Sequence, residues 1–144
     1  MQKVSGVHVF LVLMKAFRSV AQFATKSIES SHLNDSDFRV LEVLLHKGPL
    51  PVNVIGPKVF LTPGSISVAV DRLYEKGLVT RQDCARDRRL KFVNLTAEGR
   101  KLIETVFSEH EKQMDELMHV LNKTEREQLV ETLKKLGKHA ESLQ

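Results

Sequence analysis

The stretch LTPGSISVAVDRLYEKGLV, residues 61–79, carries the signals that a single helix needs at its start, along its face and at its end. Thr62 is a preferred N-cap residue, and Pro63 suits the first helical position, where its missing N–H costs nothing. Gly77 is typical of the residue that follows a helix. The apolar positions recur at three- and four-residue spacings and are Ile66, Ala69, Val70 and Leu73. The stretch therefore predicts a helix over residues 62–76 with one buried face and one polar, short-chained outer face.

A basic hairpin is predicted directly after this helix. Residues 78–81 and 91–95 have the composition of two short strands, and a charged loop, residues 82–90, joins them. From Lys58 to Lys91 the chain has eight positive and four negative side chains, so the whole formal net charge of +4 lies in this quarter of the sequence. A local basic excess favours a polyanionic partner such as nucleic acid, although a solvated surface has the same composition.

Two further helices and one irregular segment are predicted before residue 61. Residues 4–29 form one long helix whose N-terminal half is apolar on most sides, so it must be buried against its own core or a partner chain. A second helix starts at Asn34 or Asp35 and runs to about Lys47. Residues 51–60 have room only for a brief helix or two turns.

Two long amphipathic helices are predicted after the hairpin. Thr96 caps a helix that runs to about Leu121 with an apolar stripe at helical spacing. Thr124 and Glu127 have the spacing of a capping box, which opens a last helix through about His139. The helices at both ends of the chain have more apolar surface than one small domain covers, which favours a symmetric dimer.

The composition limits the function classes. A chain of 144 residues suits one domain, 1–144. Cys84 is the only cysteine and the six histidines are dispersed, which excludes a disulfide framework and makes a metal site unexpected. The apolar run Val7–Met14 is too short to span a bilayer, and Lys15 and Arg18 behind it argue against a signal peptide. We therefore expect a cytoplasmic protein that contacts no membrane.

The order of elements in residues 33–95 is helix, short helix, helix, hairpin, which is the order of a winged helix-turn-helix. The predicted fold is mainly α with a small β-hairpin wing, a DNA-binding core at 33–95, and dimerisation helices at 1–30 and 97–144. A polar-faced helix suits the major groove, and a hairpin with arginines at its tip suits the adjacent minor groove.

The sequence resembles the MarR family of winged helix-turn-helix transcriptional regulators in three ordered blocks. The blocks are LTPGS with DRLYEKGLV in residues 61–79, DRR at residues 87–89, and VNLTAEG at residues 93–99. The resemblance covers about residues 5–140, and its one departure is Gly56-Pro57, where such proteins have a regular short helix.

The resemblance implies a homodimer that binds double-stranded DNA through a recognition helix at 62–76 and a wing at 82–91. Arg89 aligns best with the family's minor-groove arginine, and Asp87 is expected to brace Arg89 or Arg88 by a hydrogen bond. Arg72 has the alternative of pairing with Asp71 or Glu75 on the helix surface. The expected DNA-binding residues are Thr62, Ser65, Ser67, Val68, Arg72, Arg86, Asp87, Arg88 and Arg89.

The resemblance also implies a small-molecule effector, expected to be aromatic or phenolic, that relieves repression of a palindromic operator. Its expected binding residues, which are equally suited to the core, are Phe10, Met14, Phe17, Phe38 and His46. His110 lies in an apolar stripe and is expected to be a satisfied core histidine.

Two alternatives to effector-relieved repression stay open. One is a redox-sensing regulator that acts through Cys84, whose pKa the neighbouring arginines would lower. The other is a winged-helix protein-interaction module without sequence-specific DNA binding. No cofactor is expected, and the sequence holds no nucleophile–base pair or metal cluster that would favour an enzyme.

Overall fold

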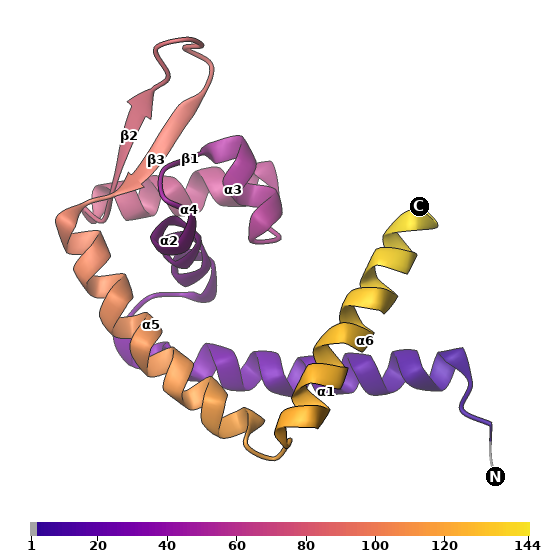
Figure 1. Cartoon of the computed structure of the whole chain (residues 1–144). Helices are drawn as coiled ribbons and strands as arrows, with labels where there is room; N and C mark the ends of the chain where they lie inside the picture. Colours follow the sequence, from indigo (N-terminus) through magenta and orange to yellow (C-terminus); the bar gives the residue numbers. More distant parts are fainter. Residues whose placement is uncertain (1–2) are drawn as a thin grey trace. The chain divides into compact units, whose positions relative to one another are not determined.

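The structure is a computed structural model that describes residues 3–144 as two compact units, one ending at His110 and one from Glu111 to Gln144 (Figure 1). The elements are α1 (Gly6–Lys26), a 3-10 turn η1 (Glu29–Ser31), α2 (Asp35–Lys47), β1 (Leu50–Pro51), α3 (Val52–Lys58), α4 (Pro63–Glu75), β2 (Val79–Asp83), β3 (Lys91–Leu95), α5 (Ala97–Met118) and α6 (Lys123–Ser142). The predicted fold class, mainly helical with a small β wing, is confirmed.

The sheet has three antiparallel strands in the order β1-β3-β2, whereas the sequence predicted only the β2–β3 hairpin. The missed strand pairs Leu50 with Val93 and Pro51 with Phe92. A two-residue strand that ends in proline carries no alternating pattern, and proline is tolerated because β1 lies at the sheet edge. The hairpin projects beyond α2, α3 and α4 (Figure 1).

The core of the winged part is formed by one face of each of its helices and by the hairpin. The predicted inner face of α4 is confirmed, because Ile66, Ala69, Val70 and Leu73 are at most 2% exposed. They pack in one cluster with the inner residues of α2 and β3, which are Phe38, Val40, Leu41, Leu44, Val93 and Leu95. Helix α5 enters this cluster through Ile103 and Val106.

The predicted helix starts are confirmed at three caps and wrong at a fourth. The side chains of Asn34, Thr62 and Thr96 accept the backbone N–H of the third residue beyond each. The last capping box joins Asn122 and Glu125, not Thr124 and Glu127. Asparagine outranks threonine as a cap, and Glu125 already stands three residues after Asn122.

Gly99 lets α5 start against the end of α4. A Cβ at this position would overlap the backbone carbonyl of Leu78. Thr96 adds two hydrogen bonds at the same corner, from its N–H to the Leu78 carbonyl at 3.1 Å and from its hydroxyl to the Gly77 carbonyl at 2.7 Å. The first turn of α5 is therefore fixed to the junction of α4 and β2.

Helix α1 has no buried residue in the single chain, although its composition is apolar. Its exposed large apolar side chains are Val7, Val9, Phe10, Leu11, Val12, Leu13, Met14 and Phe17. The apolar stretch is longer than the run Val7–Met14, since Gly6–Ser31 is long and apolar enough to cross a membrane by length and composition. A helix that packs against a second protein chain has the same composition.

Candidate DNA interface

Helix α4 presents the short polar side chains that the sequence placed on its outer face. Thr62 donates its hydroxyl hydrogen to Ser65 Oγ at 2.9 Å, and Ser67 Oγ donates to the Pro63 carbonyl at 3.0 Å. Val68, the residue after Ser67, is 58% exposed. The surface therefore offers hydroxyl oxygens and two methyl groups, and none of these side chains is used in the core.

Arg72 forms an ion pair with a residue that the sequence did not indicate as its partner. Its guanidinium donates three hydrogen bonds of 2.7–3.1 Å to the carboxylate of Asp37, which is 1% exposed and belongs to α2. The alternative pairing with Asp71 or Glu75 is wrong. The hydrogen bonds to Asp37 raise the pKa of Arg72 above its ordinary range. Lys76, one turn later, places its Nζ 3.9 Å from the same carboxylate.

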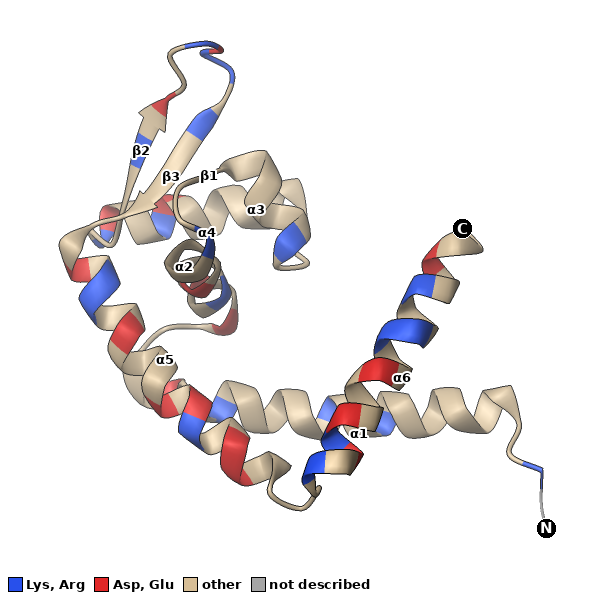
Figure 2. Cartoon of the chain, in the orientation of Figure 1, with Lys and Arg blue, Asp and Glu red and all other residues tan. Residues whose placement is uncertain are grey.

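The tip of the wing holds three exposed arginines on a closed loop. The Cys84 N–H donates to the Leu90 carbonyl at 2.9 Å and thereby continues the pairing of β2 with β3. Asp87 Oδ1 accepts the backbone N–H of Arg89 at 2.9 Å, so the expected brace acts on the backbone and not on a guanidinium. The side chains of Arg86, Arg88 and Arg89 are exposed, and basic residues line the tip (Figure 2).

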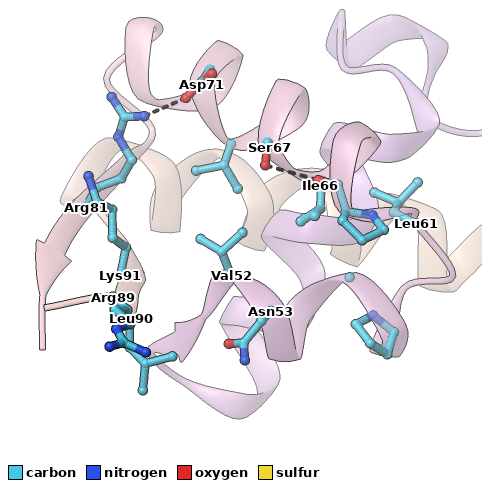
Figure 3. Close-up of a pocket in the computed structure, with 14 residues that line it drawn as sticks. Val52, Asn53, Leu61, Ile66, Ser67, Asp71, Arg81, Arg89, Leu90 and Lys91 are labelled. Atoms are coloured by element: carbon cyan, nitrogen blue, oxygen red, sulfur yellow. Dashed lines mark hydrogen bonds and ion pairs between the residues drawn. The ribbon is translucent and has the colours of Figure 1, made fainter. Parts of the chain in front are cut away.

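Arg81 joins the wing to α4, and sequence reasoning missed it. Its guanidinium forms an ion pair with Asp71 at 2.5 Å (Figure 3). The same group lies over the Tyr74 ring, 4.1 Å from the centroid. Both partners belong to α4, whereas Arg81 belongs to β2. Asp71 thus orients Arg81. In the sequence, the only signal for this ion pair was an acidic and a basic residue ten positions apart.

A cavity of about 510 Å³ lies between α3, α4 and the wing. Apolar side chains such as Val52, Leu61 and Ile66 form one part of its wall (Figure 3). Arg81, Arg89 and Lys91 line the part on the wing side. Ser67 and Asp71 of α4 and Arg89 of the wing tip therefore line one concave surface, whose wing side is basic.

The five expected effector residues lie in three different surroundings. Met14 and Phe17 line an open groove on α1, and Phe10, on the same helix, is 57% exposed. Phe38 is 5% exposed and belongs to the core. His46 stacks edge-on against Phe107 of α5 with 4.7 Å between centroids.

His110 joins three helices at the base of the winged part, in agreement with its expected core role. Its Nδ1 lies 2.6 Å from Ser27 Oγ, and its ring packs edge-on against Phe38. Since the Ser27 hydroxyl donates to the Ala24 carbonyl, Nδ1 must carry the hydrogen. Burial lowers the pKa of His110 below its ordinary value of 6.5, and the charge of Glu42 opposes this shift.

Cys84 is half-buried at the base of the loop and forms no disulfide. Among residues 3–144, no three histidine, cysteine or acidic side chains are grouped as metal ligands would be.

Comparison with known proteins identifies the family. The sequence model of the MarR family matches residues 33–91. The HTH-type transcriptional regulator MhqR of Bacillus subtilis (strain 168) is 39% identical over 135 residues, which cover 94% of this chain and 93% of MhqR. The chain belongs to the MarR family of transcriptional regulators.

Two solved MarR-like structures extend the similarity to the fold of nearly the whole chain. BpsR of Bordetella bronchiseptica, whose DNA binding is regulated by 6-hydroxynicotinic acid, is 25% identical with a TM-score of 0.80 over 90% of this chain and 98% of BpsR. NadR, solved in complex with 4-hydroxyphenylacetate, is 25% identical with a TM-score of 0.76 over 96% of each chain.

Removing the Arg72 guanidinium should destabilise the winged part. Arg72→Ala leaves the buried Asp37 carboxylate with Lys76 as its nearest cation, and we expect the free energy of unfolding to fall by about 1–3 kcal/mol. Arg88→Ala, at the exposed wing tip, is the matched control and should change stability by less than about 0.5 kcal/mol. Urea denaturation followed by circular dichroism measures both. Equal stability of the two variants would contradict the anchoring role of Arg72.

Stability should depend on the ionisation of His110. Because its folded pKa is lowered, the unfolded chain binds more protons between that value and 6.5, so stability rises with pH through this window and levels off above it. Urea denaturation between about pH 5.5 and 7.5 tests this. His110→Gln should flatten the dependence, and His119→Gln, at an exposed position, should keep it. If His110→Gln kept the pH dependence of stability of the wild-type protein, that dependence would come from another titratable group.

Proposed function

We propose that the protein is a homodimeric transcriptional repressor of the cytoplasm that binds a palindromic operator and is released by a small aromatic effector. The observation that carries DNA binding is the exposed polar face of α4 beside a wing tip with three exposed arginines, with Ser67 and Arg89 lining one concave surface. Thr62, Ser65, Ser67 and Val68 would meet the major groove, and Arg86, Arg88 and Arg89 the backbone and minor groove. Asp87 shapes the loop, and Arg72 holds α4 in place instead of reaching DNA.

The dimer is supported by the exposed apolar surface of α1. A contiguous set of exposed apolar side chains, among them Phe17 at 70% exposure, is typical of a surface that a partner chain covers. Two recognition helices would then lie roughly 34 Å apart, which is one turn of the DNA helix, and would match a palindrome.

An aromatic effector is supported by BpsR, whose DNA binding is regulated by 6-hydroxynicotinic acid, and by NadR, solved in complex with 4-hydroxyphenylacetate. An effector that binds better to a dimer with another spacing of its recognition helices shifts the population away from the DNA-binding form. The groove that Met14 and Phe17 line on α1 is a candidate part of its site.

Arg89→Ala tests the DNA interface. We expect roughly a five- to hundredfold loss of affinity for a DNA fragment selected by the wild-type protein, together with a smaller salt dependence, because a guanidinium is removed from the phosphate-lined groove. Lys123→Ala removes a cation that is 90% exposed on α6 and is the matched control. Fluorescence anisotropy at several salt concentrations measures both. Unchanged affinity of Arg89→Ala would favour the alternative of a protein-interaction module.

Phe17→Asp tests the dimer. A charge in the apolar face of α1 should weaken association, because a carboxylate cannot be buried there without a partner. Light scattering should give a dimer for the wild-type protein and a smaller species for the variant at micromolar concentration. The control Phe60→Asp, at a position 90% exposed after α3 and outside the segments expected to form the dimer, should remain a dimer. A stable Phe17→Asp dimer would place the interface elsewhere.

A further inference from the structure

The turn between α3 and α4 contains an aromatic residue in a conformation that aromatic residues rarely adopt. Phe60 has φ 58°, in the left-handed region, and its side chain is 90% exposed. Left-handed conformations strain any residue with a Cβ, and bulky residues are genuine outliers there. Phenylalanine in this conformation therefore costs conformational energy, and its exposed ring does not offset the cost by packing within the fold.

The backbone requires this conformation whatever the side chain is. The Leu61 N–H donates to the Gly56 carbonyl at 2.9 Å, and the Phe60 N–H lies 3.5 Å from the Pro57 carbonyl. These two bonds form the Schellman motif that ends α3, and its left-handed residue is usually glycine. Turns of helix-turn-helix units often contain glycine for the same reason.

The chain uses glycine at the same position of the same motif after α4. Gly77 has φ 73°, and the N–H groups of Gly77 and Leu78 donate to the carbonyls of Tyr74 and Leu73 at 3.0 Å. Phenylalanine in place of glycine after α3 is thus a departure that local folding does not favour. A side chain that the fold does not use, at a position where it is strained, indicates a contact outside the chain.

The surroundings of Phe60 fit a polyanion as that contact. Residues 48–70 contain no aspartate or glutamate, and Lys58 is their only charged side chain. Phe60 stands two residues before Thr62, the N-cap of the recognition helix. In helix-turn-helix proteins, the N-terminal residues of this helix contact base edges in the major groove.

We propose that Phe60 is an apolar contact to DNA at the entrance of the recognition helix, an inference that rests on the proposed DNA-binding function. The ring packs against a thymine methyl or against the apolar edge of a deoxyribose beside the groove. Phe60 thereby adds affinity without adding a phosphate contact, which separates its role from that of Lys58 and the wing arginines.

The test compares Phe60→Asn with the wild-type protein on a DNA fragment that the wild-type protein selects from genomic DNA. Asparagine tolerates the left-handed conformation, so the variant should have an unchanged or higher Tm. It should bind DNA about fivefold or more weakly, with an unchanged slope of log affinity against log salt, because no counterion release is lost. The matched control Lys58→Ala should instead lower that slope by about one.

Deoxyuridine in place of thymine distinguishes the two apolar sources. If the ring meets a methyl, the wild-type protein binds the substituted fragment more weakly than the original one. The Phe60→Asn variant, which has no ring, shows no further loss of affinity on the substituted fragment. If it meets a sugar, the difference between the two proteins persists.

Three results would overturn the proposal. If Phe60→Asn bound DNA with an affinity within twofold of that of the wild-type protein, the proposed contact of Phe60 with DNA would be wrong, and the proposed function would still stand. A lower Tm of the variant would show that the ring packs within the fold. A wild-type protein that selects no DNA fragment would overturn the proposed function together with this inference.

Discussion

The buried carboxylate of Asp37 is the constraint on which the DNA-binding geometry depends. A carboxylate that is 1% exposed must be paired, and both of its cations, Arg72 and Lys76, come from α4. Because the three hydrogen bonds of Arg72 are directional, they fix the rotation of α4 about its own axis as well as its distance from α2. The rotation decides which side chains of α4 face outward. Asp37, a residue of α2, therefore determines which surface α4 presents.

The basic side chains of this region divide into two groups with different physical roles. Arg72 and Arg81 are braces, the first tying α4 to α2 and the second tying the wing to α4. Arg86, Arg88 and Arg89 are exposed at the wing tip and are held only through the backbone of their loop. Net charge cannot separate these groups, since a braced arginine and a free one count equally.

Most of what the sequence predicted correctly depends on local spacing, which nonetheless failed for the cap of α6. The caps at Thr62 and Thr96 and the inner face of α4 follow from residues within one or two turns of each other, and these predictions are confirmed. The partner of Arg72 lies 35 residues away, on a helix whose orientation no local pattern specifies. The strand β1 and the conformation of Phe60 were missed for the same reason, because each is imposed by a neighbour rather than by its own composition.

The corner between α4, β2 and α5 links the first turn of the long helix α5 mechanically to the end of α4. Thr96 binds the carbonyls of Gly77 and Leu78, and Gly99 lies so close to Leu78 that a methyl group does not fit. A packed contact of this kind cannot be compressed, so a displacement of the first turn of α5 must move the end of α4 with it. At its other end this part of α5 meets α1 and α2 through His110. Since the Asp37 carboxylate resists rotation of α4 against α2, a displacement of α5 is carried mainly by the winged part as one body.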